Sequence, residues 1–144
     1  MKKTAFFVLI SSTIVCNAHE CATHHSDDFL TISIKNNTSF ACHLNQTDLK
    51  QGKIHALTTI PQQISSGQES RPIVIHEWNT VDLSLTYQCG DNQFITIKSQ
   101  KNGKMVKAIV TSASNMNANY NTTPAVYNYS AGTTSAGSIY WTLY

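Results

Sequence analysis

The sequence predicts an all-β protein, an antiparallel β-sandwich of about eight short strands. Apolar and polar residues alternate with a period of two in Phe29–Ile34 and in Val81–Cys89, which is the pattern of half-buried strands. Turn signals such as Asn102-Gly103 separate the apolar runs at the spacing of a sandwich or a barrel. No segment repeats apolar residues at i, i+3, i+4 and i+7 over two helical turns, so the pattern does not favour helices.

The first eighteen residues have the pattern of a cleavable signal peptide. Lys2 and Lys3 form a basic start, Ala5–Val15 is mostly apolar, and Cys16-Asn17-Ala18 places small residues where signal peptidase cuts. Val15 is too bulky for the small residue that usually precedes a lipidated cysteine. We expect a protein secreted by a Gram-negative bacterium, through the periplasm to the extracellular space.

Removal of residues 1–18 leaves 126 residues, enough for one domain with its own core. Residues 19–28 form a polar, histidine-rich leader, and residues 29–144 form the expected single β-sandwich domain. Eight basic and eight acidic residues remain, and the basic ones are scattered. This balance lacks the basic patch of a nucleic-acid-binding protein, so we expect no nucleic-acid partner.

Each expected strand has a local reason. Lys35–Thr38 has turn chemistry, β-branched residues fill Ile73–Ile75, and Gly90–Asn92 forms a tight turn that makes a hairpin of its two neighbouring runs. Residues 112–118 are compatible with a single helical turn. Strands are expected at Phe29–Ile34, Phe40–Leu44, a short segment after Gly52, Pro72–Trp78, Val81–Cys89, Phe94–Lys98, Met105–Thr111 and Ile139–Tyr144.

Cys21, Cys42 and Cys89 remain after processing. In an oxidising compartment two of them should pair. We predict a Cys42–Cys89 disulfide because each residue ends a run that looks like a core strand. Cys21 lies in the leader and is left free or paired between chains.

Catalytic and metal-binding motifs are weak. His19, Cys21, His24 and His25 cluster in the leader without the two separated ligand pairs of a structural zinc site. His76 and Glu77 are neighbours in a strand and should point to opposite faces. No nucleophile elbow, phosphate loop or zinc-protease helix is present. We therefore predict no enzymatic activity, no metal site and no cofactor.

The strongest functional signal is aromatic. Tyrosine and tryptophan combine an apolar body with a polar tip, which suits lipid interfaces, sugars and protein hot spots. Adjacent residues of a strand face opposite ways, so of Tyr140 and Trp141 we expect one buried and one exposed. The predicted ligand-binding set is Trp78, Tyr120, Tyr127, Tyr129, Tyr140 and Trp141.

The first half of the chain resembles aegerolysin-like and actinoporin-like secreted β-sandwiches. The residues concerned are Ile32–Thr38, Leu49–Lys53 and Ile64–Gly67. Proteins of these families bind membrane lipids and sometimes form pores. Their lipid-binding positions do not map onto this chain residue by residue.

A second set of segments is similar to the periplasmic inhibitors of C-type lysozyme, which are small β-barrels. Leu85–Cys89, Phe94–Ile97 and Ser135–Tyr140 carry the likeness, the last as a candidate inhibitory loop. Ala136 stands where the inhibitors have serine, and the chain ends four residues after Tyr140.

These observations together predict a non-enzymatic binding protein that acts at a host or target-cell surface, with a role in virulence. Its partner would be a membrane lipid or a glycan, or else a target protein, and its oligomeric state stays open. The alternative is an inhibitor of a secreted hydrolase such as lysozyme. A third option, an outer-membrane barrel, needs longer strands with a continuous lipid-facing apolar band.

Overall fold

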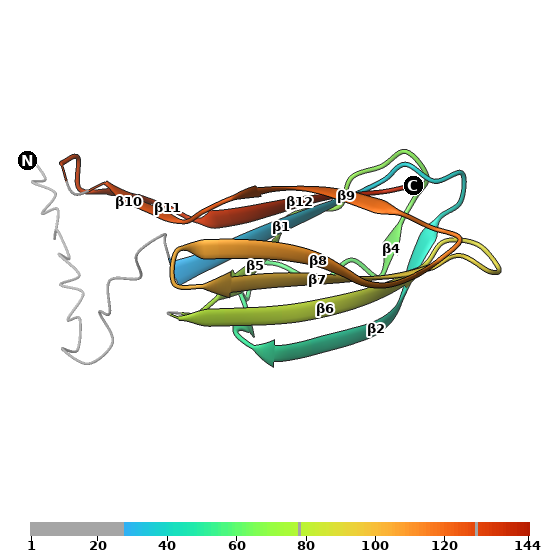
Figure 1. The fold of residues 1–144 in the computed structure, drawn as a ribbon, viewed down its shortest axis with the longest axis horizontal. Coiled ribbons are helices and arrows are strands. Elements are labelled where there is room, and N and C mark those ends of the chain that lie inside the picture. The colour runs from blue at the N-terminus through green and yellow to red at the C-terminus, as the bar shows by residue number, and fades with distance from the viewer. Residues whose placement is uncertain (1–27, 78, 129) are drawn as a thin grey trace, which may run out of the picture.

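The computed structural model describes residues 28–77, 79–128 and 130–144. These residues form two five-stranded sheets that face each other, with a two-stranded hairpin projecting beyond one end (Figure 1). The all-β sandwich expected from the sequence is confirmed. The signal peptide and almost all of the leader lie outside the described residues.

The first sheet has the strand order β3-β5-β1-β12-β9, and the second has the order β4-β2-β6-β7-β8. The bounds in the first sheet are β3 Lys53–Ile54, β5 Ile73–His76, β1 Phe29–Asn36, β12 Gly137–Leu143 and β9 Ala118–Thr123. Those in the second are β4 Gln63–Ile64, β2 Cys42–Gln51, β6 Thr80–Gln88, β7 Phe94–Asn102 and β8 Met105–Ser114. The hairpin consists of β10 Val126–Asn128 and β11 Thr133–Ser135.

Two features differ from the sequence prediction. The described residues hold twelve strands rather than about eight, because the sequence analysis did not predict β4, β9, β10 and β11. Of these, β4, β10 and β11 are two or three residues long, too short to show an alternating pattern. The sandwich is also not wholly antiparallel, because β1 and β12 pair in parallel from Leu30–Gly137 to Asn36–Leu143. The two ends of the domain therefore lie side by side in the middle of the first sheet.

The core lies between the sheets and consists of the inward half of each alternating strand. The inward positions of β12, for example, are buried while Ser138, Tyr140 and Thr142 lie on the outer side. β6 and β7 show the same alternation in the second sheet. The main buried side chains are Leu30, Ile32, Ile34, Ile73, Ile75, Leu83, Leu85, Tyr87, Ile95, Ile97, Ile139, Trp141 and Leu143.

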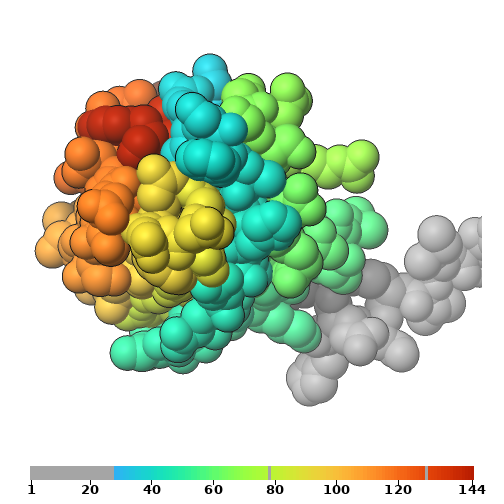
Figure 2. All heavy atoms as spheres, turned by 90° about the vertical axis from the view of Figure 1, so that its right-hand side faces the viewer, coloured from blue at the N-terminus to red at the C-terminus, as the bar shows by residue number. Residues whose placement is uncertain are grey.

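Cys42 and Cys89 form a disulfide, as predicted. The bond joins the start of β2 to the residue after β6, across a sequence separation of 47 residues. Chain-entropy models give a cross-link of this length a stabilisation of about 4 kcal/mol. The bond is compatible with an exported protein. Figure 2 views the end of the sandwich where the β1–β2 connection (cyan) lies beside the β6–β7 turn (yellow) and the last residues (red).

The predicted turns are largely confirmed. β6 and β7 form the expected hairpin from Thr80–Asn102 to Gln88–Phe94, and Gly103 takes a positive φ of 55° between β7 and β8. The helical turn considered for residues 112–118 is wrong. β8 continues to Ser114, Asn115 turns the chain at a φ of 52°, and β9 follows. The described part of the chain has no helix with the length and apolar character needed to cross a membrane.

Candidate functional site

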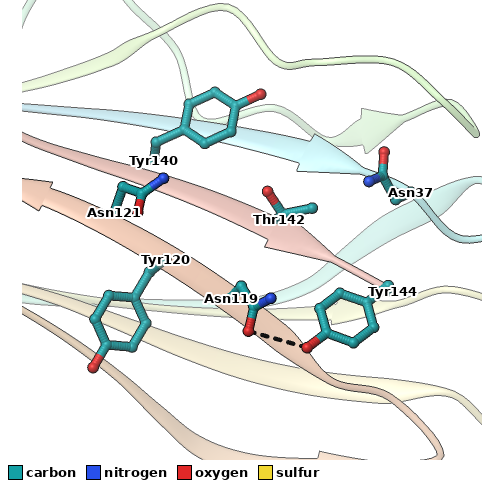
Figure 3. A pocket seen from close by; sticks show the side chains of 7 residues that line it. All are labelled: Asn37, Asn119, Tyr120, Asn121, Tyr140, Thr142 and Tyr144. Carbon is teal, nitrogen blue, oxygen red and sulfur yellow. Dashed lines mark hydrogen bonds between the residues drawn. The ribbon is translucent and has the colours of Figure 1, made fainter.

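A depression lies on the outer surface of β9 and β12. Its volume is about 740 Å³ and it is open to solvent. Six of its lining residues lie together on the outer side, and we call them the tyrosine–asparagine face: Asn37, Asn119, Asn121, Tyr140, Thr142 and Tyr144 (Figure 3). Tyr120 also lines the depression, but it leaves β9 in a different direction from Asn121.

Strand register explains why these residues meet. Side chains two apart on one strand share a face, so Tyr140 and Thr142 lie on the same side of β12. β9 pairs antiparallel with β12, which puts Asn121 opposite Tyr140 and Asn119 opposite Thr142. Four residues of the face therefore lie on two adjacent strands, while Asn37 follows β1 and Tyr144 follows β12.

Backbone hydrogen bonds hold the C-terminal side of the face. The amide of Tyr144 donates to the Asn117 carbonyl at 3.0 Å, and the amide of Asn117 donates back to the Tyr144 carbonyl at 2.8 Å. The amide of Asn37 donates to the Leu143 carbonyl at 2.8 Å. The Tyr144 hydroxyl donates to Asn119 Oδ1 at 3.0 Å, which fixes the ring over the asparagine (Figure 3).

Tyr140 is held from the opposite side. Its hydroxyl donates to Glu69 Oε2 at 2.9 Å, so the ring reaches toward the β4–β5 connection. This hydrogen bond, with smaller contributions from desolvation and the carboxylate charge, raises the pKa of Tyr140 above its ordinary value. The phenol thus stays neutral over the physiological pH range.

Several polar groups of the face have no protein partner. Within the described residues, nothing hydrogen-bonds the side-chain amides of Asn37 and Asn121 or the Thr142 hydroxyl. The lining contains no charged side chain. Lys35 on β1 lies opposite Thr142 in the β1–β12 register, and its backbone forms an isolated β-bridge with that of Glu69.

Trp141 must be removed from the predicted ligand-binding set. It is fully buried between the sheets, and its indole nitrogen donates to Ser99 Oγ at 3.0 Å. Its position on the inward side of β12 is the physical reason. The expectation that one of Tyr140 and Trp141 is buried and the other is not is confirmed.

The other members of that set do not form one site. Tyr120 is 50% exposed at the sheet edge, and its ring meets Trp141 edge-on at 5.3 Å. Tyr127 is half-buried on β10, away from the residues that line the depression. Trp78 and Tyr129 lie outside the described residues. Of the set, only Tyr140 lies on the tyrosine–asparagine face, with Tyr120 beside it.

The sequence analysis did not identify the asparagines of the face as candidate site residues. Four residues of the face occupy alternate positions along β9 or along β12 and the residue after it, so the alternating pattern could have grouped them: Asn119, Asn121, Thr142 and Tyr144. The alternation in β9 was not recognised because residues 112–118 are also compatible with a single helical turn, so no strand was expected at Ala118–Thr123. Asn37 was interpreted only as a turn residue, and its place beside the chain end needs the parallel β1–β12 pairing.

The segment Ser135–Tyr140 is not a protruding loop. Gly137 starts β12, is buried, and lies so close to Val106 that a Cβ atom at this position would come within 2.6 Å of it. Ser138 and Tyr140 are paired with β9 on one side and β1 on the other. Gly137–Tyr140 therefore belongs to the central strand β12 and Ser135 to β11, so the expectation of a loop at Ser135–Tyr140 is wrong, while the hydrolase-inhibitor alternative stays a prediction.

The other two depressions described are smaller. One depression of about 410 Å³ lies beside Phe40 and His43, and one of about 270 Å³ lies beside Met105 and Lys107. Across residues 28–77, 79–128 and 130–144, no three His, Cys, Asp or Glu side chains are arranged to hold a metal ion. The histidines and Cys21 of the leader lie outside these ranges.

No family model matches this chain, and no curated protein matches its sequence. Among solved structures it is similar to the lipid-binding protein Nakanori, with a TM-score of 0.64, 12% identity, and coverage of 80% of this chain and 70% of Nakanori. It is also similar to RahU, crystallised with a TRIS molecule, with a TM-score of 0.58, 15% identity, and coverage of 82% and 95%. IP-1A from Alcaligenes faecalis gives a TM-score of 0.49, 14% identity, and coverage of 83% and 92%.

At these identities the likeness shows a shared fold alone. A lipid-binding protein among the fold neighbours is in keeping with the resemblance to lipid-binding β-sandwiches. The family itself stays a prediction.

Proposed function

We propose that this chain is a non-enzymatic binding protein that recognises a membrane lipid or a glycan on a target-cell surface through the tyrosine–asparagine face. One observation carries the proposal. Two tyrosine rings and three asparagine side chains gather in a solvent-open depression over β9, β12 and the residue that follows β1, with polar groups that the protein leaves unpaired. Aromatic residues with a few placed polar groups are typical of ligand sites.

The arrangement suits binding better than catalysis. The lining offers phenol, amide and hydroxyl groups and no titratable base or acid of ordinary catalytic use. The one carboxylate at the border, Glu69, already accepts a hydrogen bond from Tyr140. The fold neighbours add a protein described as lipid-binding, which supports a surface role.

The test compares variants that remove rings from different faces. The exported protein is applied to liposomes, immobilised glycans and cells, beside the Tyr140→Ala and Tyr144→Ala variants. Each change should weaken binding about thirtyfold, the effect of losing a hot-spot ring worth about 2 kcal/mol. Phe40→Ala is the matched control, because Phe40 is 54% exposed on a different surface.

Binding that survives both tyrosine changes, or that falls only with Phe40→Ala, would place the ligand elsewhere. Absence of binding to every lipid, glycan and cell would count against a surface role altogether.

A further inference from the structure

We infer that the ligand of the tyrosine–asparagine face is a neutral glycan rather than a lipid headgroup. This inference rests on the proposed function and narrows it to one chemical class. It follows from the hydrogen-bonding capacity of the lining, from its charge and from the placement of its two rings.

The free polar groups of the face both donate and accept hydrogen bonds. Asn37 and Asn121 each present an amide with two donor hydrogens and an acceptor oxygen, and Thr142 presents a hydroxyl. Asn119 accepts from Tyr144 through Oδ1, which leaves its NH₂ group to donate outward. Sugar hydroxyls also donate and accept, so they can satisfy both kinds of group at once. Phosphate oxygens mainly accept, and a quaternary ammonium does neither.

The charge of the face points the same way. Recognition of phosphate depends mainly on arginine or lysine, and attraction to anionic lipid depends on clustered basic residues. The lining has no cation, and Lys35 on the adjacent strand β1 is a single basic neighbour, opposite Thr142 in the β1–β12 register. An anionic headgroup would therefore not meet a cluster of basic side chains here.

The two rings are placed for an extended ligand. Tyr140 and Tyr144 are four residues apart along one edge of the face, so their Cα atoms are about 13 Å apart in extended backbone. The apolar C–H side of a pyranose packs on an aromatic ring, while its hydroxyls reach neighbouring polar groups. Thr142 lies between the two tyrosines along β12, whereas Asn121 lies beside Tyr140 and Asn119 beside Tyr144 (Figure 3). This spacing suits an oligosaccharide rather than one monosaccharide.

The site is also formed before a ligand arrives. Tyr140 is tied to Glu69, Tyr144 to Asn119, and the backbone of Tyr144 to Asn117. Side chains already held in place lose little conformational entropy on binding. An uncharged, strongly hydrated ligand such as a sugar needs this advantage because each hydroxyl exchanges a hydrogen bond to water for one to the protein and adds only a small net free energy.

The experiment uses an array of neutral oligosaccharides and two kinds of vesicle, phosphatidylcholine alone and phosphatidylcholine with phosphatidylserine. Wild-type protein should bind a subset of the neutral glycans, and Asn121→Ala should lower that affinity about tenfold by removing a donor and an acceptor together. Asn45→Ala is the matched control, since Asn45 is an exposed strand residue of the second sheet. Binding should change little between about 0.05 and 0.5 M salt, because no charge pair is involved.

The possible outcomes distinguish failure of the glycan inference from failure of the proposed function. Vesicle binding that requires Tyr140 and Tyr144, without glycan binding, would overturn the glycan inference and leave the proposed function standing. Glycan binding that Asn121→Ala leaves unchanged would also overturn it. Failure of the tyrosine variants to affect any binding would overturn both.

Discussion

The outer surfaces of the two sheets are both polar, yet they use their polar groups in different ways. On the second sheet, Asp82 Oδ2 lies 3.0 Å from Lys98 Nζ and accepts a hydrogen bond from Gln100 at 3.0 Å. The Thr96 hydroxyl lies 2.9 Å from those of Thr86 and Ser112. These side chains pair with one another across β6, β7 and β8, although Asp82 Oδ1 is buried without a hydrogen-bond partner.

The tyrosine–asparagine face of the first sheet is different. The amides of Asn37 and Asn121 and the hydroxyl of Thr142 are left to solvent, and the hydrogen bonds of Tyr140 to Glu69 and of Tyr144 to Asn119 orient the two rings. A surface whose groups pair internally has little left to offer a ligand, whereas one with oriented and unpaired groups has donors and acceptors ready. We therefore expect changes on the second sheet to alter stability and changes on this face to alter binding.

The largest effect should come from Trp141, directly beneath the face. Trp141→Ala removes a fully buried indole and its hydrogen bond to Ser99, which should lower the free energy of unfolding by about 3–5 kcal/mol. Its neighbour Tyr140 lies on the outer side of the same strand, so Tyr140→Ala should cost far less stability. Urea denaturation of both variants checks the contrast. Equal losses would mean that the face is part of the core.

Asp82 should give a smaller effect on the second sheet. The Asp82 and Lys98 side chains are only 17% and 21% exposed, so Asp82→Ala leaves a mostly buried ammonium without its carboxylate. We expect a loss of about 2 kcal/mol, reduced from the value for a fully buried pair by the remaining solvent. Ligand affinity should be unchanged. A variant with normal stability and weakened binding would reverse the comparison between the two sheets.

The sequence carried enough information for the strands of the core and little for the site. Alternation in Phe29–Ile34 and Val81–Cys89 marks buried faces directly. The Cys42–Cys89 bond was predicted correctly because both residues lie at strand boundaries, although Cys42 starts β2 rather than ending a strand. Alternation depends only on the residues of one strand, which is why it can be detected without the fold.

The site depends on partners far apart in the chain. Asn37 reaches the end of β12 only through the parallel β1–β12 pairing, and Tyr140 meets Glu69 across a separation of 71 residues. The sequence analysis placed Trp141 in the ligand-binding set because tryptophan suits binding, but Tyr140 lies on the outer side of β12 and Trp141 on the inner side. Residue type alone could not decide which side of the strand faces the core.

The smallest predicted effect compares a tyrosine from each sheet. Burial raises the pKa of Tyr87 far above its ordinary value of about 10, and its hydroxyl donates to the Pro61 carbonyl at 3.0 Å. The pKa of Tyr140 is raised mainly by a hydrogen bond to Glu69, at the surface. Tyr87→Phe should cost about 1 kcal/mol at pH 7 through the lost hydrogen bond.

Alkaline pH should remove the difference in stability between the wild-type protein and Tyr87→Phe. Because the folded-state pKa of Tyr87 is raised, its contribution to stability is complete below about pH 10, where the unfolded chain also keeps the phenol protonated. Above pH 10 the unfolded phenol ionises while the folded one cannot, so wild-type stability falls by up to about 1.4 kcal/mol per pH unit from this group. Tyr87→Phe lacks this loss, and the two proteins should become equally stable within about one pH unit above 10.

Urea denaturation at several pH values between 7 and 11 measures the gap. Tyr140→Phe is the matched control, because solvent screens its carboxylate partner and the pH dependence of its stability difference should be much weaker. A Tyr87→Phe gap that stays constant to pH 11 would show that the Tyr87 phenol ionises in the folded protein as an exposed one does. The Tyr87 hydroxyl would then not behave as a buried group, and the predicted difference between the interior Tyr87 and the surface Tyr140 would be wrong.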